Sequence, residues 1–177
     1  AQLSYVVMAA GILKPLAEIG AAVHIVAHAF GKITLFFAAG AIYTAAKKTE
    51  LHQLRGIGHR MPLTMLAFTI GALSMIGVPP MAGFVSKWSI LAGAFEADNY
   101  VAIVTIIVST ALNAAYFLPF IYMAWFEREV APPSTPHGEA PWPSVLALTL
   151  TAALTLLFFF FNGPVLELER QVVMGAP

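Results

Sequence analysis

Residues 24–43, HIVAHAFGKITLFFAAGAIY, combine a strongly apolar stretch with three basic side chains. The second half is apolar enough to lie in a lipid bilayer, yet His24, His28 and Lys32 precede it at intervals of four residues. Residues four apart lie on nearly the same face of a helix, so the three side chains form a column about 12 Å long. A lysine at the centre of a spanning helix costs about 2.5–3.5 kcal/mol and usually faces a bundle interior or a hydrated cavity.

The rest of the chain has the composition of a membrane protein. Of its 177 residues, 59% are hydrophobic and 10% are charged, and the mean hydropathy is +0.81; soluble domains carry about 25% charged residues. No charged residue occurs in residues 61–86, 99–126 or 140–166. Each of these runs exceeds the roughly 20 residues that a helix needs to cross the hydrocarbon core. The sequence therefore predicts an integral membrane protein with an all-α fold, a polytopic bundle of membrane helices.

Charge and cysteine content narrow the classes of partner. The net charge is zero, so no general attraction to nucleic acid follows from it. The chain has no cysteine, which excludes disulfides and thiolate-held clusters within it. No cofactor is expected. The first residues, AQLSYVVMAAG, resemble the middle of a hydrophobic segment, so we expect a fragment that lacks upstream helices.

Breakers and polar linkers divide the chain into about six predicted membrane segments. These are residues 1–13, 19–46, 62–76, 80–95, 100–126 and 144–161. The polar connection 47–61 holds four basic residues and is predicted to face the cytoplasm. We expect residues 1–126 to form a membrane domain, 127–143 a proline-rich loop, and 144–177 a final membrane helix and tail.

The segment over residues 80–95 is predicted to begin at a helix break. Pro79 and Pro80 remove two backbone donors, and Gly77 and Gly83 add conformational freedom on either side. Broken membrane helices are tolerated where their free backbone groups line protein or water. Lys87 lies just beyond this break. Burial disfavours the charged form of lysine and histidine exchanges protons near neutral pH, so Lys87, Lys32, His28 and His24 are candidates for a proton relay.

A weaker polar pattern follows on the segment over residues 100–126. Thr105, Ser109, Asn113 and Tyr116 recur at spacings of four, four and three, which places them on one helix face. Together with Ser86, they are candidate channel-lining residues. Packing between helices is the open alternative, because small polar residues are common at membrane helix contacts.

The basic residues also have simpler interpretations that stay open. Lys32 could extend toward a membrane interface, and Lys87 could be a shallow lysine at a helix boundary. His24 and His28 could hydrogen-bond neighbouring helices. Histidines four apart can share zinc, but the zinc-protease pattern places a glutamate where Ile25 stands, and no third ligand is evident. No metal site is therefore predicted.

Two stretches together resemble a known family. Residues 24–43, followed by GALSMIGVPPMAGFVSKWSILAGAF at 71–95, resemble the antiporter-like membrane subunits of respiratory complex I and of Mrp-type cation/proton antiporters. The resemblance covers residues 1–126 and implies that they form the C-terminal part of a proton-translocating, antiporter-like membrane domain, in which this chain supplies the last six helices of a longer core. It also implies that Lys32, His28, His24 and Lys87 belong to a buried axis of charged residues. A glutamate–lysine pair in the first half of the family fold has no counterpart here.

The resemblance implies proton translocation within a multisubunit membrane complex. GFVSKW at 83–88 and NAAYFLPFIYMAWFE at 113–127 look closest to the MrpD type of antiporter subunit, with sodium or potassium as the exchanged ion. The alternative is a proton-pumping subunit of NADH-quinone oxidoreductase or of a related hydrogenase-linked complex. We expect a bacterial plasma membrane location. A purely structural subunit remains a rival, whereas a membrane enzyme would need a nucleophile or metal triad that the sequence does not show.

Overall fold

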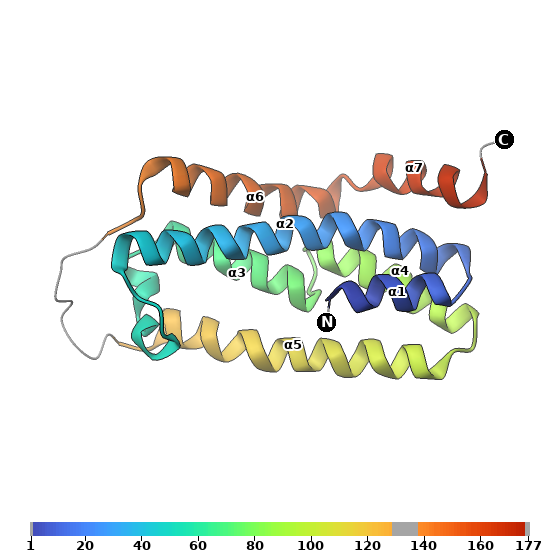
Figure 1. Cartoon of the computed structure of the whole chain (residues 1–177), viewed down its shortest axis with the longest axis horizontal. Coiled ribbons are helices and arrows are strands. Elements are labelled where there is room, and N and C mark those ends of the chain that lie inside the picture. The colour runs from blue at the N-terminus through green and yellow to red at the C-terminus, as the bar shows by residue number, and fades with distance from the viewer. Residues whose placement is uncertain (1, 129–137, 176–177) are drawn as a thin grey trace.

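The computed structural model describes residues 2–128 and 138–175, apart from the side chains of residues 173 and 174. The described part is all-α, and its long helices run along the long axis of the molecule (Figure 1). The α-helices are α1 (Gln2–Gly11), α2 (Pro15–Ala46), α3 (Pro62–Ile76), α4 (Ala82–Glu96), α5 (Tyr100–Phe126), α6 (Trp142–Phe160) and α7 (Gly163–Met174); η1 (Leu51–Leu54) and η2 (Ile57–His59) are 3₁₀ turns. The predicted fold class, an all-α membrane bundle, is confirmed.

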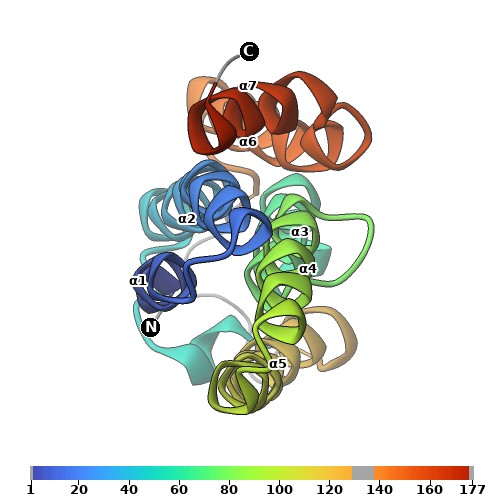
Figure 2. The same ribbon diagram turned by 90° about the vertical axis from the view of Figure 1, so that its right-hand side faces the viewer.

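Helix α2 is the central element of the bundle. Helices α1, α3, α4, α6 and α7 all pack against it, and Figure 2 shows them grouped around its axis. Pro15 lies in its first turn, where a missing backbone N–H costs nothing. The helix ends at Ala46. The next residue, Lys47, has a left-handed backbone conformation, and its N–H donates to the carbonyl of Tyr43. The column of His24, His28 and Lys32 therefore lies on the helix with the most neighbours.

Among the described residues, three helices are long and apolar enough to cross a membrane: α2, α5 and α6. Helices α3 and α4 are shorter, and they lie end to end beside α2 (Figures 1 and 2). The segments predicted over residues 62–76 and 80–95 are thus both helical, but they form two halves of one broken helix. The chain keeps its direction through the break at residues 77–81, so the two halves are arranged as one interrupted helix and not as an antiparallel pair (Figure 1).

The C-terminal part differs from the prediction in one respect. Residues after Asn162 were expected to form a tail, but Pro164 occupies a first helical turn and α7 continues to Met174. Residues 129–137 of the predicted proline-rich loop lie outside the described residues. Beyond them, Gly138 to Pro141 lead into α6.

Candidate functional site

The break between α3 and α4 leaves helix carbonyls free. Gly77 ends α3 with φ +92°, a left-handed conformation that favours glycine. Its N–H and that of Val78 both bond the carbonyl of Leu73, at 2.9 and 3.1 Å. The carbonyls of Met75 and Ile76 therefore have no partner within the helix. Pro79 and Pro80, which cause the break, lie exposed in the connection.

Lys87 fills the position next to these carbonyls. Its Nζ donates to Met75 O at 3.0 Å and to Ile76 O at 2.9 Å, and the residue is only 6% exposed. The carboxyl end of a helix carries partial negative charge, which favours an ammonium group there. Within residues 2–128 and 138–175, no carboxylate forms an ion pair with Lys87. A buried cation is thus held by backbone dipoles.

Close packing of α4 on α3 keeps Lys87 in place. A Cβ at Gly83 would overlap the carbonyl oxygen of Ser74, so only glycine fits at this contact. The Gly83 N–H donates to Ser74 Oγ at 3.1 Å. The aliphatic stem of Lys87 passes Gly77, where a Cβ would come within 2.8 Å of Lys87 Cδ. Both predicted break glycines therefore leave room, Gly83 for the backbone of α3 and Gly77 for the lysine.

His24 adjoins Lys87 through the neighbouring Ser86. His24 is 2% exposed, and its Nδ1 lies 2.8 Å from Ser86 Oγ. The Ser86 hydroxyl also donates to Gly83 O at 3.1 Å, an arrangement that suits the tautomer in which the Nδ1–H of His24 donates to Ser86. In that tautomer, Nε2 of His24 is a proton acceptor. The ring of His28 lies 6.1 Å away and nearly parallel, at 8°.

Three buried side-chain atoms at this site have no hydrogen-bond partner within the described part of the chain. They are Gln2 Oε1, His24 Nε2 and His28 Nδ1. Buried polar atoms in proteins nearly always have a partner, and water supplies it where neighbouring protein groups do not. The spacing of the two histidine rings suits a bridging water better than a direct bond. The site therefore offers three neighbouring polar atoms to which water can bind.

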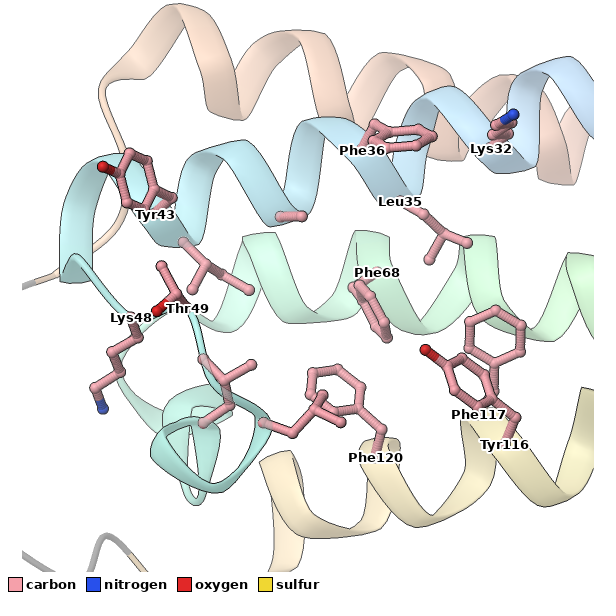
Figure 3. A pocket seen from close by; sticks show the side chains of 14 residues that line it. Lys32, Leu35, Phe36, Tyr43, Lys48, Thr49, Phe68, Tyr116, Phe117 and Phe120 are labelled. Carbon is pink, nitrogen blue, oxygen red and sulfur yellow. The ribbon is translucent and has the colours of Figure 1, made fainter.

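The structure places Lys32 apart from the buried group. Lys32 is exposed on this chain, and its Nζ lies 5.7 Å from the centre of the Phe36 ring. It borders a cavity of ≈ 600 Å³ between α2, η1, α3 and α5, and Figure 3 shows it at one end, with Lys48 and Thr49 at the other. The cavity is mainly apolar and aromatic, with Phe68 among its lining residues.

The predicted polar column on α5 is divided in the structure. Ser109 accepts a hydrogen bond of 2.6 Å from the Tyr5 hydroxyl and so joins the buried group. Tyr116 lines the cavity that Lys32 borders. Thr105 is exposed and donates to Val101 O in its own helix, at 2.7 Å. Asn113 is half-buried.

Two residues of α1 belong to the site and were not predicted. Tyr5 is 3% exposed; its ring centre lies 5.0 Å from Lys87 Nζ and 5.5 Å from the His24 ring. Gln2 donates from Nε2 to Met75 O at 3.2 Å, and this is one of the carbonyls that hold Lys87. The only available signal was two polar side chains three residues apart in an apolar opening, a spacing that places them on one helix face.

Comparisons with known proteins agree with this architecture. The family model described as NADH:quinone oxidoreductase/Mrp antiporter, TM, matches residues 1–113. The chain is 38% identical over 143 residues to NADH-quinone oxidoreductase subunit N of Desulforudis audaxviator, which covers 81% of this chain and 28% of that protein. It is 31% identical to the D-type subunit of the Na(+)/H(+) antiporter of Alkalihalophilus pseudofirmus, over 97% of this chain and 34% of that protein.

A solved structure shares the fold. The structure of the Mrp complex from Dietzia sp. DQ12-45-1b contains a chain that superimposes with a TM-score of 0.86 at 20% identity, over 99% of this chain and 40% of that one. The chain thus spans 28% and 34% of the lengths of the two curated relatives above. With the family model matching well over half of its length, the chain belongs to the family of antiporter-like membrane subunits that NADH:quinone oxidoreductases and Mrp antiporters share.

Proposed function

We propose that this chain is part of a proton-translocating membrane subunit and that Lys87, His24, His28 and Lys32 relay the proton. The observation that carries the proposal is the buried amine of Lys87. It is held at a helix break by two backbone carbonyls, and no described carboxylate pairs with it. An ionisable group kept in a membrane interior without a counter-ion is expensive, and such groups mark ion and proton pathways.

The next acceptor after Lys87 is His24. In the tautomer whose Nδ1–H donates to Ser86, its buried Nε2 accepts a proton. His28 follows one turn along α2, and a single water between the two rings would complete a hydrogen-bonded connection. Histidine suits this role, since it gains and loses a proton near neutral pH.

Lys32 would pass the proton out of this part of the subunit. It follows His28 by one turn of α2 and is exposed beside the cavity on the surface of this chain. The curated relatives described above are about three times as long as this chain, so their remaining helices can cover such a surface. We therefore place Lys32 at the junction with the rest of the subunit.

We propose a subunit of an Mrp-type antiporter, similar to the MrpD type, which exchanges protons for sodium or potassium together with partner subunits in a bacterial plasma membrane. The alignment with a D-type antiporter subunit over 97% of this chain supports this assignment. The second candidate is a proton-pumping subunit of an NADH-quinone oxidoreductase. This second candidate is favoured by sequence identity, which is 38% to subunit N of such a complex and 31% to the D-type antiporter subunit.

The test uses the full-length subunit in its assembled complex, reconstituted in vesicles with an internal pH dye. Lys87→Ala and Lys32→Ala should each abolish coupled proton movement at unchanged complex abundance, because each removes a carrier from the row. Arg170→Ala, on the exposed face of α7, is the matched control and should transport normally.

The driving reaction separates the two candidates. Proton movement upon addition of NaCl or KCl supports the antiporter, and movement only with NADH and a quinone supports the oxidoreductase. Normal transport by both lysine variants under both conditions would contradict the relay.

A further inference from the structure

Tyr5 contacts both Lys87 and His24, the first two members of the proposed relay. It comes from α1, whereas His24 lies on α2 and Lys87 on α4. Its ring centre lies 5.0 Å from Lys87 Nζ, and its ring meets that of His24 edge-on at 5.5 Å. With 3% exposure, Tyr5 is fixed in the core of the site.

Within the part of the chain that the structure describes, the groups in contact with the Lys87 ammonium group cannot take up its proton. The ammonium group of a lysine has three N–H donors. In this conformation it bonds the carbonyl oxygens of Met75 and Ile76 and also lies over the Tyr5 ring. Neither an amide carbonyl nor an aromatic face takes up a proton at neutral pH, although both stabilise the ammonium form.

The one exchangeable proton of the Tyr5 side chain is not directed at Lys87 or His24. Its hydroxyl donates to Ser109 Oγ on α5 at 2.6 Å, a short bond between two helices far apart in sequence. This bond fixes the orientation of the ring. The ring therefore presents only carbon and its hydrogens to Lys87 and His24.

We propose that Tyr5 is the gate of the proton path and that its bond to Ser109 holds the gate closed. When that bond breaks, the ring can turn aside and a water molecule can enter between Lys87 and His24. An N–H bond of Lys87 then breaks and one forms at His24 Nε2, so the lysine becomes neutral and the histidine cationic. This inference rests on the proposed function and adds the point at which transfer is controlled.

Proton leak is the measurement that tests the gate. In vesicles holding the full-length subunit in its complex, a pH gradient is imposed without coupling ion or electron donor, and its decay is followed. Tyr5→Phe keeps the ring and removes the bond to Ser109, and Ser109→Ala removes the same bond from the other side. Each should speed the decay about two- to tenfold, the effect of losing one buried hydrogen bond. The double variant should leak no more than either single variant.

Matched controls use the same substitutions at positions outside the site. Tyr122→Phe changes an exposed tyrosine of α5, and Ser89→Ala changes a serine whose hydroxyl donates to Val85 O in its own helix. Neither should alter the leak. Complex abundance, measured for every variant, separates a leak from poor assembly.

Two outcomes would contradict the proposal that Tyr5 is a gate. One is an unchanged leak in both Tyr5→Phe and Ser109→Ala. The other is reduced coupled transport without any leak, which would make the tyrosine hydroxyl a proton carrier. Adding Lys87→Ala to Tyr5→Phe should return the leak to the wild-type level, because the leak passes through Lys87.

Failure of the gate is distinguishable from failure of the relay. If Lys87→Ala alone transports normally, the proposed function fails, whatever the Tyr5 variants do. If Lys87→Ala is inactive while Tyr5→Phe and Ser109→Ala leak like wild type, the proposed relay is supported and the proposed gate is contradicted.

Discussion

Gly83 shows how one missing side chain holds the two halves of the broken helix together. Its Cα approaches the backbone of α3 so closely that any Cβ would overlap Ser74 O. Gly83→Ala should therefore lower the free energy of unfolding by about 1–3 kcal/mol, as overpacking does in tight cores. Thermal unfolding of the full-length subunit in detergent measures the change.

Gly40→Ala is the matched control for this prediction. It lies inside α2, where a Cβ would meet no described atom within 4 Å. Alanine in a helix interior is about 0.5–1 kcal/mol more favourable than glycine, so this variant should be as stable as wild type or more so. Equal losses of stability at both positions would show that the contact with Ser74 is not the cause.

From the sequence, only those residues of the candidate site could be predicted that are ionisable side chains within an apolar segment. Lys87 and His24 attract attention because a charge or imidazole in an apolar run is costly, and the structure places both in one buried group. Tyr5 has no such signature, since tyrosine is common in membrane segments. Its role depends on α1 packing between α2 and α5, which spacing within one segment does not show. The exposure of Lys32 likewise depends on its neighbours in three dimensions.

At the scale of elements, α3 is fixed at its N-terminus by a residue from a distant part of the chain. Glu139 accepts hydrogen bonds from Leu63 N at 2.6 Å and Thr64 N at 3.3 Å, and from Thr64 Oγ1 at 2.6 Å. The first N–H groups of a helix have no partner within it, and a carboxylate there also favours the helix dipole. The segment before α6 thus caps the half-helix whose other end holds Lys87.

Removing this cap should loosen the start of α3. We expect Glu139→Ala to cost about 1–2 kcal/mol, as the loss of other helix caps does. Hydrogen exchange should speed up at the amides of Leu63 and Thr64 and stay unchanged at the centre of α3. Glu167→Ala, an exposed glutamate of α7, is the control. Unchanged exchange at Leu63 and Thr64 would show that Glu139 does not cap the helix.

The positions of the helices were largely predictable, because prolines, glycines and polar linkers mark where the apolar segments begin and end. The runs predicted over residues 62–76 and 100–126 coincide with α3 and α5. Helix α7 was not predicted: the last membrane segment was expected to end at residue 161 and to be followed by a tail, although Pro164 is suited to the first turn of a new helix. The alignment of α3 with α4 was missed for a different reason. A break in sequence does not say whether the chain reverses or continues.

At the scale of the whole molecule, that alignment decides how often the chain crosses the membrane. The ends of α2 and α5 near η1 lie at one end of the bundle, and the turn between α4 and α5 lies at the other (Figure 1). If α3 and α4 form one crossing, Thr49 and Arg128 are on the same side of the membrane and Glu96 is on the opposite side. Two separate crossings would instead place Glu96 with Thr49, and Arg128 opposite them.

Labelling of single cysteines separates these two topologies cleanly, because this chain contains no cysteine of its own. In a cysteine-free full-length subunit, Thr49→Cys, Glu96→Cys and Arg128→Cys each place one thiol at an exposed position. We expect a membrane-impermeant maleimide, added to sealed vesicles of one orientation, to label Thr49→Cys and Arg128→Cys alike. Glu96→Cys should react only from the other face. Labelling of Glu96→Cys from the same side as Thr49→Cys would contradict the single broken crossing, and with it the position of Lys87 at a break within the membrane.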